Sequence, residues 1–435
     1  MKLFVMDMID DEGCGMDIAL RAKEAGHSVR YWMGSKHLAG TGLVEKVNEW
    51  RPSMEWAELV VLTGNCDYPQ GFEDYFTRGY PIFGTNPMAA ELELDRGKGQ
   101  EILERYRVET APYEVVSSPE EAIEVILKAG RPYALKPWGG ETDKAMTCVP
   151  RDVNEALFHI LKWKKEGTFS GQLMMQEMIK GVEVGIAGYF GPGGWSSVFE
   201  ESFEHKKFLN DDLGENTGEQ GTVIRHVKES KLFREILEPI TDYLHLIHFV
   251  GDCNVNCIVA GGIPYPLEFT MRLGWPDACI RYEVFQGDPV EWMADLIYGR
   301  DSLRVRPDVA VGVVMTHGDY PKEREKPEVW SGYPIEGITD QNWKHLHFQQ
   351  VRDGSAPRYV GGKLKSAAMT VTAGTYPLVV TGSGVRVRVA QKKAYEVADA
   401  IRWPSNVMYR TDIGDRLQND LEELHKHGYA KGMEF

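Results

Sequence analysis

Cysteine is scarce in this sequence, with six residues scattered over 435 positions. So sparse a set argues against a disulfide framework. Long apolar runs are missing as well, since no stretch approaches the ~18 residues that a membrane span needs. The first residues, MKLFVMDMIDDEG, reach Asp7 too early for the apolar core of a signal peptide. We therefore expect a cytoplasmic protein of several domains, with no membrane partner.

Basic side chains are outnumbered: 49 Lys and Arg stand against 65 Asp and Glu, which gives a formal net charge of −16. An acidic surface disfavours nonspecific binding to nucleic acid or to an anionic membrane. It still allows a small basic pocket for phosphates. Hydrophobic residues make up 43% of the chain, which is ample for buried cores and excludes disorder as the dominant state.

Three segments differ in their patterns. Residues 1–94 alternate short apolar strands with helical stretches, which predicts a Rossmann-like α/β domain with a parallel sheet. Residues 95–304 mix helices and strand pairs, as α+β folds do. Residues 305–435 are β-rich, with the strands VAVGVVMTHG, AAMTVTA, YPLVVTG and VRVRVAQ before a helix from KKAYEVADAI. The sequence therefore predicts a multidomain α/β and α+β protein with a small β-rich C-terminal domain.

The first strand is followed by DDEGCGMDIAL, in which Gly13 and Gly15 precede a helix. Free N–H groups at a helix start can receive an anion. The glycines are too few for a dinucleotide fingerprint, and a tight turn is the simpler interpretation.

Two further segments have residue patterns of nucleotide sites. In LKPWGGETDKAM, Lys136 ends a strand and precedes a glycine-rich loop with Lys144, so a strand lysine and loop N–H groups could hold phosphates. In MMQEMIKGVEVG, an extended edge at Glu177 and Met178 could pair with adenine, and Glu183 could accept ribose hydroxyls. A surface hairpin and an amphipathic strand would have the same patterns.

The segment before and within IPYPLEFTMRLG indicates a metal site. Asn256 precedes Glu268 by twelve residues, with a turn at Gly261–Gly262, so two antiparallel strands would set the two side chains side by side. Oxygen ligands of this kind suit Mg²⁺. The nearby Cys253 and Cys257 resemble half of a zinc site, but no comparable Cys or His pair lies close in sequence, so packing in a strand is the simpler explanation.

The order of these segments resembles the ATP-grasp superfamily and, within it, the phosphoribosylamine–glycine ligases (glycinamide ribonucleotide synthetases). The resemblance covers most of the chain. It rests on PIFGTNPMAAELELDR, the GGETDK loop, QEMIKGVE, EHKKFLNDDLGENTG, LEFTMRLGWPD, MTHGDYP and YRTDIGDRL. It implies an ATP-grasp core at 95–304 with a mobile lid at about 110–185, between the domains 1–94 and 305–435.

The resemblance also implies a role for individual residues. The cofactors would be ATP and Mg²⁺ (or Mn²⁺), the substrates an amino acid and an amine, and the assembly a monomer or homodimer. Residues expected to act in catalysis are Lys136, Arg96, Lys144 and Lys206. Those expected to bind ATP are Arg96, Lys136, Gly139, Gly140, Lys144, Glu177, Met178 and Glu183. Those expected to bind substrate are Gly13, Gly15, His205, Asp212, Asn216, Thr217, Gly218 and Arg272. Those expected to bind metal are Glu268, Asn256 and Thr270.

The sequence departs from the family pattern at several of these places. Arg96 replaces a lysine and Thr270 an asparagine. The family's Arg-Phe-Gly-Asp-Pro-Glu run appears as RLGWPD at 272–277, and GEQG at 218–221 replaces Gly-Gly-Met-Gly. DDEGCGMD takes the place of the phosphate loop Gly-Gly-Arg-Glu-His, and TGN at 63–65 that of Gly-Pro-Glu. The nucleotide half thus retains its pattern, and the half that holds phosphoribosylamine in the family differs.

Three functions remain open at this point. The first is the family's reaction, in which glycine and phosphoribosylamine are joined through an acyl-phosphate in purine biosynthesis. The second is an ATP-grasp ligase that uses another amine, as the altered N-terminal loop suggests. The third is a nucleotide-binding protein without catalysis, which Thr270 and Arg96 suggest.

Overall fold

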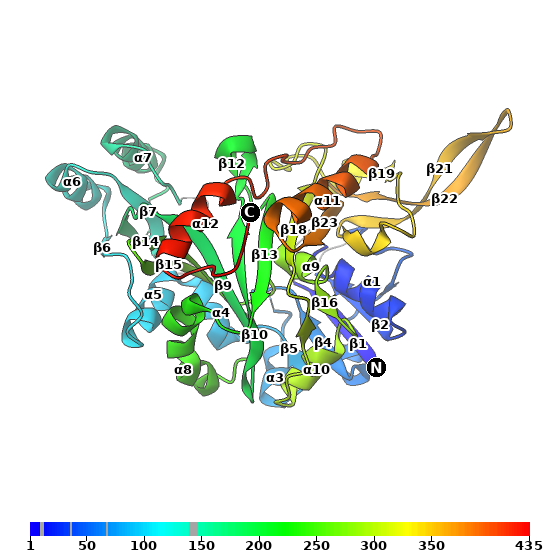
Figure 1. The fold of residues 1–435 in the computed structure, drawn as a ribbon, viewed down its shortest axis with the longest axis horizontal. Helices are drawn as coiled ribbons and strands as arrows, with labels where there is room; N and C mark the ends of the chain where they lie inside the picture. The colour runs from blue at the N-terminus through cyan, green and yellow to red at the C-terminus, as the bar shows by residue number, and fades with distance from the viewer. Residues whose placement is uncertain (9–12, 35–36, 67, 139–146, 170) are drawn as a thin grey trace.

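The computed structural model describes residues 1–8, 13–34, 37–66, 68–138, 147–169 and 171–435. Its N-terminal part is a parallel sheet of order β3-β2-β1-β4-β5 (Figure 1). Its strands are β1 (Lys2–Asp7), β2 (Ser28–Met33), β3 (Glu45–Lys46), β4 (Leu59–Leu62) and β5 (Ile82–Phe83). The accompanying helices are α1 (Met16–Glu24), α2 (Arg51–Trp56), α3 (Glu73–Thr77) and α4 (Pro87–Leu94). The predicted strand–helix alternation is confirmed.

A small antiparallel sheet of order β6-β8-β7 follows helix α5 (Arg96–Arg105). It consists of β6 (Tyr113–Val116), β7 (Tyr133–Trp138) and β8 (Gln172–Glu177), with α6 (Pro119–Ala129) and α7 (Val153–Glu166). Ser118 and Asp152 cap these two helices by accepting a backbone N–H three residues on. A separate apolar core joins the two helices to the sheet, and both helices lie at one end of the molecule (Figure 1).

The largest sheet is antiparallel, with the order β15-β14-β9-β10-β13-β18-β23-β20. Its strands are β9 (Val182–Gly191), β10 (Gly194–Glu204), β13 (Gly221–Val227), β14 (Gly251–Ala260), β15 (Ile263–Thr270), β18 (Val309–Met315), β20 (Leu346–Phe348) and β23 (Leu378–Gly384). Three of them come from the segment after residue 305, so the C-terminal segment extends the central sheet through the β13–β18 pairing.

Shorter elements surround this sheet. The remaining strands are β11 (Lys207–Leu209), β12 (Leu213–Asn216), β16 (Phe285–Gln286), β17 (Arg304–Val305), β19 (Ser331–Pro334), β21 (Val351–Val360) and β22 (Lys363–Ala373). The remaining helices are α8 (Thr241–Leu246), α9 (Asp277–Arg281), α10 (Glu291–Ile297), α11 (Val387–Ala400) and α12 (Leu417–Lys426). Single helical turns are η2 (Asn210–Asp212), η3 (Phe233–Leu237), η4 (Glu238–Ile240), η5 (Pro327–Trp330) and η6 (Trp343–His345). The hairpin β21–β22 projects from the body opposite α6 and α7 (Figure 1).

One strand prediction is wrong. The alternating VRVRVAQ at 385–391 is expected as a strand, yet α11 begins at Val387. Val387, Ala390, Ala394 and Ala398 are buried at helical spacing against β23 and β18. Packing on the sheet thus outweighs the β-preference of the valines.

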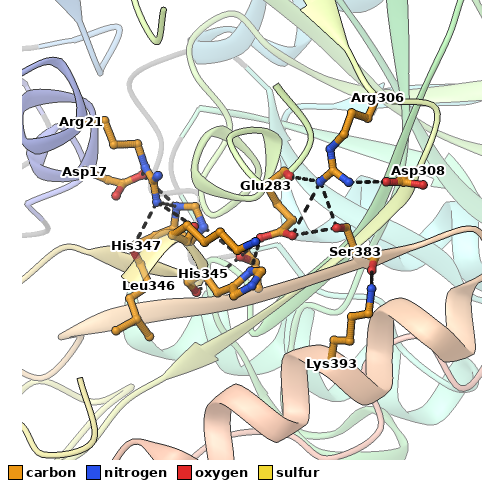
Figure 2. A network of polar contacts seen from close by, with 12 residues as sticks. Asp17, Arg21, Glu283, Arg306, Asp308, His345, Leu346, His347, Ser383 and Lys393 are labelled. Carbon is orange, nitrogen blue, oxygen red and sulfur yellow. Dashed lines mark hydrogen bonds and ion pairs between the residues drawn. The ribbon is translucent and has the colours of Figure 1, made fainter. Parts of the chain in front are cut away.

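Helix α1 is tied to the far edge of the central sheet by a buried polar network (Figure 2). Asp17 accepts a hydrogen bond from Arg21 at 2.9 Å and lies 2.9 Å from the His347 ring. Arg21 also donates to the Leu346 carbonyl at 3.2 Å. Because Gly15 immediately precedes α1, this network fixes Gly15 and the start of α1 relative to β20.

The structure also bears on the expectations about membrane spans and cysteines. Within the described residues, no helix combines the length and apolar character that a membrane crossing requires. The six cysteines are free. Cys253 and Cys257 are both buried in β14, and the Cys257 thiol lies 3.0 Å from the Val184 carbonyl oxygen. In this strand the two thiols serve as packing groups.

Candidate active site

A cavity of about 260 Å³ opens at the ends of β10 and β15, beside the middle of β14. Most of its lining is polar or charged. The lining residues are Glu93, Glu204, Lys206, Gly218, Glu219, Asn254, Asn256, Glu268, Phe269, Thr270, Arg272, Gly274, Trp275 and Asp277. The three predicted metal ligands line it, and so do three of the predicted catalytic or substrate residues, Lys206, Gly218 and Arg272.

The β14–β15 hairpin sets Asn256 opposite Glu268 and Asn254 opposite Thr270. The predicted pairing of Asn256 with Glu268 is therefore confirmed. The Asn256 amide group donates to Glu204 at 2.8 Å. Its buried carbonyl oxygen has no hydrogen-bond partner within the described part of the chain. A carboxylate beside an amide oxygen suits Mg²⁺, so this pair fits the ion.

Lys206 lies among three carboxylates. Its ammonium nitrogen is 3.1 Å from Glu204 and 3.5 Å from both Glu183 and Glu268. Burial lowers the pKa of Lys206, but Glu204, Glu268 and Glu183 together raise the pKa well above its usual value. On the other side, the Arg96 guanidinium is 3.8 Å from Glu268. Glu268 thus lies between two cationic side chains, Lys206 and Arg96.

Lys136 approaches the same charges from the small sheet. It lies in β7 and donates to Gln176 of β8 at 2.8 Å. Burial lowers its pKa to about 8; Arg96 and Lys206 act in the same direction, and Glu268 opposes them. A lysine with a pKa of about 8 is still mostly protonated at pH 7, and a bound anion such as a phosphate would raise its pKa.

The loop after β10 is held by the C-terminal segment. His205 is buried and accepts the Gly414 N–H at 3.1 Å. Burial, with Arg416 and Arg410 nearby, lowers the His205 pKa to about 3, so the ring is neutral at pH 7. Asp212 accepts a hydrogen bond from Arg410 at 2.8 Å.

The end of this loop leads into the cavity. Asn216 pairs with Lys207 in the β11–β12 hairpin. The Thr217 hydroxyl donates to the Lys206 carbonyl at 2.9 Å. Gly218 lines the cavity. The loop therefore holds the backbone of Lys206 through Thr217, while residues 209–216 at its tip are exposed.

Comparison with known proteins decides the family. Residues 98–278 match the family model of the phosphoribosylglycinamide synthetase ATP-grasp (A) domain, and residues 310–416 match that of the C domain. The two matches span about two thirds of the chain. The chain belongs to the phosphoribosylglycinamide synthetase family.

Relatives and solved structures agree with this assignment. A phosphoribosylamine–glycine ligase from Vibrio cholerae is 27% identical over 378 residues, covering 82% of this chain and 83% of that protein. One from Xylella fastidiosa is 27% identical over 392 residues, covering 86% and 85%. The crystal structure of a phosphoribosylamine–glycine ligase from Thermotoga maritima has a TM-score of 0.72 at 20% identity, covering 95% of this chain and all of that one. An N5-carboxyaminoimidazole ribonucleotide synthetase solved as an ADP complex has a TM-score of 0.58 at 13% identity, covering 91% and 96%. The predicted fold class is confirmed.

Some residues that the synthetase resemblance assigned to ATP lie outside this cavity. Glu177, at the end of β8, is paired with Arg131. Met178 follows it and is half-buried. Glu183, at the start of β9, contacts Lys206. The lid residues Gly139, Gly140 and Lys144 lie outside the described residues. The ATP-binding roles of all these residues stay predictions.

Gly13 and Gly15 lie directly before α1, and neither lines the cavity. Gly13 has φ +67°, and a Cβ there would come within 2.9 Å of the Gln349 carbonyl oxygen, so glycine is required. The Gly15 N–H donates to the Asp7 carboxylate at 2.9 Å. Asp7 also accepts from Tyr31 at 2.6 Å and Thr63 at 3.0 Å. The protein's own carboxylate thus occupies the N–H that the sequence suggested for an anion.

Sequence reasoning missed several acidic and polar residues of the cavity. Arg272 was predicted, but its partner Glu93, 3.2 Å away at the end of α4, was not. The other missed residues are Glu204, Glu219, Asn254, Trp275 and Asp277. One signal was present: Asn254 and Asn256 alternate in a strand, and alternate residues share one face.

Proposed function

We propose that this protein is an ATP-dependent carboxylate–amine ligase that joins glycine to phosphoribosylamine. The observation that carries the proposal is the Asn256–Glu268 pair flanked by Lys206 and Arg96 at one cavity. The relatives named phosphoribosylamine–glycine ligase support the choice of substrates.

The chemical difficulty is that two anions must meet, the glycine carboxylate and the ATP γ-phosphate. Lys136, Arg96 and Lys206 supply positive charge in a partly buried site, where it stabilises developing negative charge most strongly. In the proposed reaction the carboxylate oxygen attacks the γ-phosphorus, ADP leaves, and a neutral amine then displaces phosphate from the acyl-phosphate. The acyl-phosphate hydrolyses readily, so water must be excluded at this step.

Glu268 and Asn256 would hold Mg²⁺, with Thr270 as a third oxygen donor lining the same cavity. A bound Mg²⁺ ion neutralises phosphate charge during transfer. The adenine and ribose would lie along β8 and β9 at Glu177, Met178 and Glu183. Gly139, Gly140 and Lys144 would cover the phosphates, and His205, Asp212, Asn216 and Thr217 would shape the substrate loop.

A second candidate is a ligase of the same mechanism that uses another amine. It is favoured because the Gly15 N–H is already bound to Asp7, which leaves one donor fewer for a phosphate at this sheet edge. Such a site suits an amine without phosphate.

The test is Mg²⁺-dependent ADP release with glycine and enzymatically generated phosphoribosylamine, followed by a panel of other amines. Product formation with phosphoribosylamine supports the first candidate. Activity only with another amine refutes it and supports the second. The absence of turnover with every amine would refute both and leave a nucleotide-binding protein without catalysis.

A further inference from the structure

Two departures from the family pattern that lie far apart in sequence meet in the cavity. Glu219 belongs to GEQG, where the family has Gly-Gly-Met-Gly, and Asp277 belongs to RLGWPD, where the family has Arg-Phe-Gly-Asp-Pro-Glu. Glu219 lies just before β13 and Asp277 begins α9, yet both line the same cavity. In this chain Trp275 stands in place of the family's aspartate, and Glu219 adds a carboxylate to the same cavity.

Both carboxylates are buried and incompletely satisfied. Glu219 is 7% exposed and Asp277 is 1% exposed. One oxygen of each has no hydrogen-bond partner among the described residues, and the same is true of the Asn256 carbonyl oxygen. Burial and the neighbouring carboxylates raise the pKa of both groups. A buried acceptor without a donor costs free energy. The two carboxylates therefore suit a ligand that donates hydrogen bonds and carries positive charge.

Two cations line the same cavity. They are Lys206 and Arg272, and the Arg272 guanidinium is 3.2 Å from Glu93. A cavity of about 260 Å³ that carries both carboxylates and cations matches a small zwitterion. ATP is too large to be the ligand of this cavity alone.

We propose that Glu219 and Asp277 bind the α-ammonium group of the amino-acid substrate. This inference rests on the proposed function, because it assumes that a small amino acid supplies the carboxylate. The carboxylate of the ligand would point toward Lys206 and the Asn256–Glu268 pair, where phosphoryl transfer is proposed.

The arrangement has a chemical consequence. An ammonium held between carboxylates keeps its proton, and a protonated amine has no lone pair to attack with. The activated amino acid then cannot condense with a second copy of itself. Only the other amine substrate reacts with the acyl-phosphate.

Glu219→Gln tests the proposal, because it keeps the shape of the side chain and removes its charge. With glycine and phosphoribosylamine we expect the KM for glycine to rise about 10- to 100-fold, as for the loss of a charged hydrogen bond, with the KM for ATP unchanged. Asp277→Asn should act in the same direction. Glu291→Gln, an exposed carboxylate on α10, is the matched control and should leave all constants unchanged.

Three results would overturn the proposal. One is an unchanged KM for glycine in both variants that fold normally by circular dichroism. Another is a raised Mg²⁺ requirement at an unchanged KM for glycine, which would assign the Glu219 and Asp277 carboxylates to a metal ion. The third is the absence of any difference in thermal stabilisation between amino acids and the matching acids without an amino group.

If glycine and phosphoribosylamine give no turnover, the proposed function fails but the ammonium site can still be tested. Thermal stabilisation is then measured with glycine, alanine and serine against acetate, propionate and glycerate. Stabilisation by an amino acid, absent with its partner acid and lost in Glu219→Gln, supports the site. Equal effects of the two sets, or none, would overturn it.

Discussion

Two sheet edges of this protein carry carboxylates in very different surroundings. Glu268, at the end of β15, has a side chain that is 41% exposed, and it lies beside a cavity between Lys206 and Arg96. Asp7, at the end of β1, is 1% exposed and accepts hydrogen bonds from Gly15, Tyr31 and Thr63. The comparison shows that a carboxylate at the end of a strand can face a cavity or hold the protein's own loop. Glu268 does the first and Asp7 the second.

The largest effect is expected from Lys136→Ala, in β7 at the proposed nucleotide site. The loss of a charged hydrogen bond to phosphate costs about 1.5–3 kcal/mol or more, so turnover should fall at least 10- to 100-fold while the fold is retained. ATP-dependent ADP release measures it, with Lys162→Ala on the surface of α7 as the control. Turnover at the parent rate would show that the nucleotide site lies elsewhere.

Glu268→Gln should act through the metal. An amide is a neutral and weaker Mg²⁺ ligand than a carboxylate. We expect the Mg²⁺ concentration for half-maximal activity to rise about tenfold, measured by titration at saturating ATP. The same Mg²⁺ dependence in both proteins would remove Glu268 from the ligand set and direct attention to Asp277.

Asp7→Asn tests the other edge. The substitution replaces one acceptor oxygen with an NH₂ group, which weakens the hold on Gly15 by about 1 kcal/mol. We expect the KM for the amine to rise about fivefold, with the KM for ATP unchanged. Asp74→Asn on α3 serves as the control. A change in the ATP constants would mean that the two edges are not independent.

A smaller effect concerns pH. The His205 pKa is about 3 in the folded protein, below its ordinary value of about 6.5. As pH falls below 6.5 the unfolded chain takes up the proton first, so the folded state loses about 1.4 kcal/mol per pH unit until pH nears 3. His205→Gln should flatten this acid limb in thermal unfolding, whereas His245→Gln on α8 should not. Parallel limbs in both variants would mean that His205 is protonated in the folded state.

Local sequence was sufficient where neighbouring residues set the structure. The alternation of strands and helices predicted the parallel N-terminal sheet. The Gly261–Gly262 turn predicted the β14–β15 hairpin, and with it the proximity of Asn256 and Glu268. The exact register also depends on an irregularity between Asn256 and Cys257, which shifts Asn256 from Leu267 to Glu268. VRVRVAQ misled because its alternation suits a strand, whereas burial on β23 and β18 favours a helix.

The family and the main charged residues were thus determined by the sequence itself, because they depend on residue type, order and short-range pairing. Only the tertiary structure brought Glu204, Glu219 and Asp277 into one cavity. They come from the end of β10, the residues before β13 and the start of α9, and the long-range order of the central sheet brings them together. The same holds for Asp7 and Gly15: their spacing left the use of the Gly15 N–H open, and the fold brings the Asp7 carboxylate within hydrogen-bond distance of it.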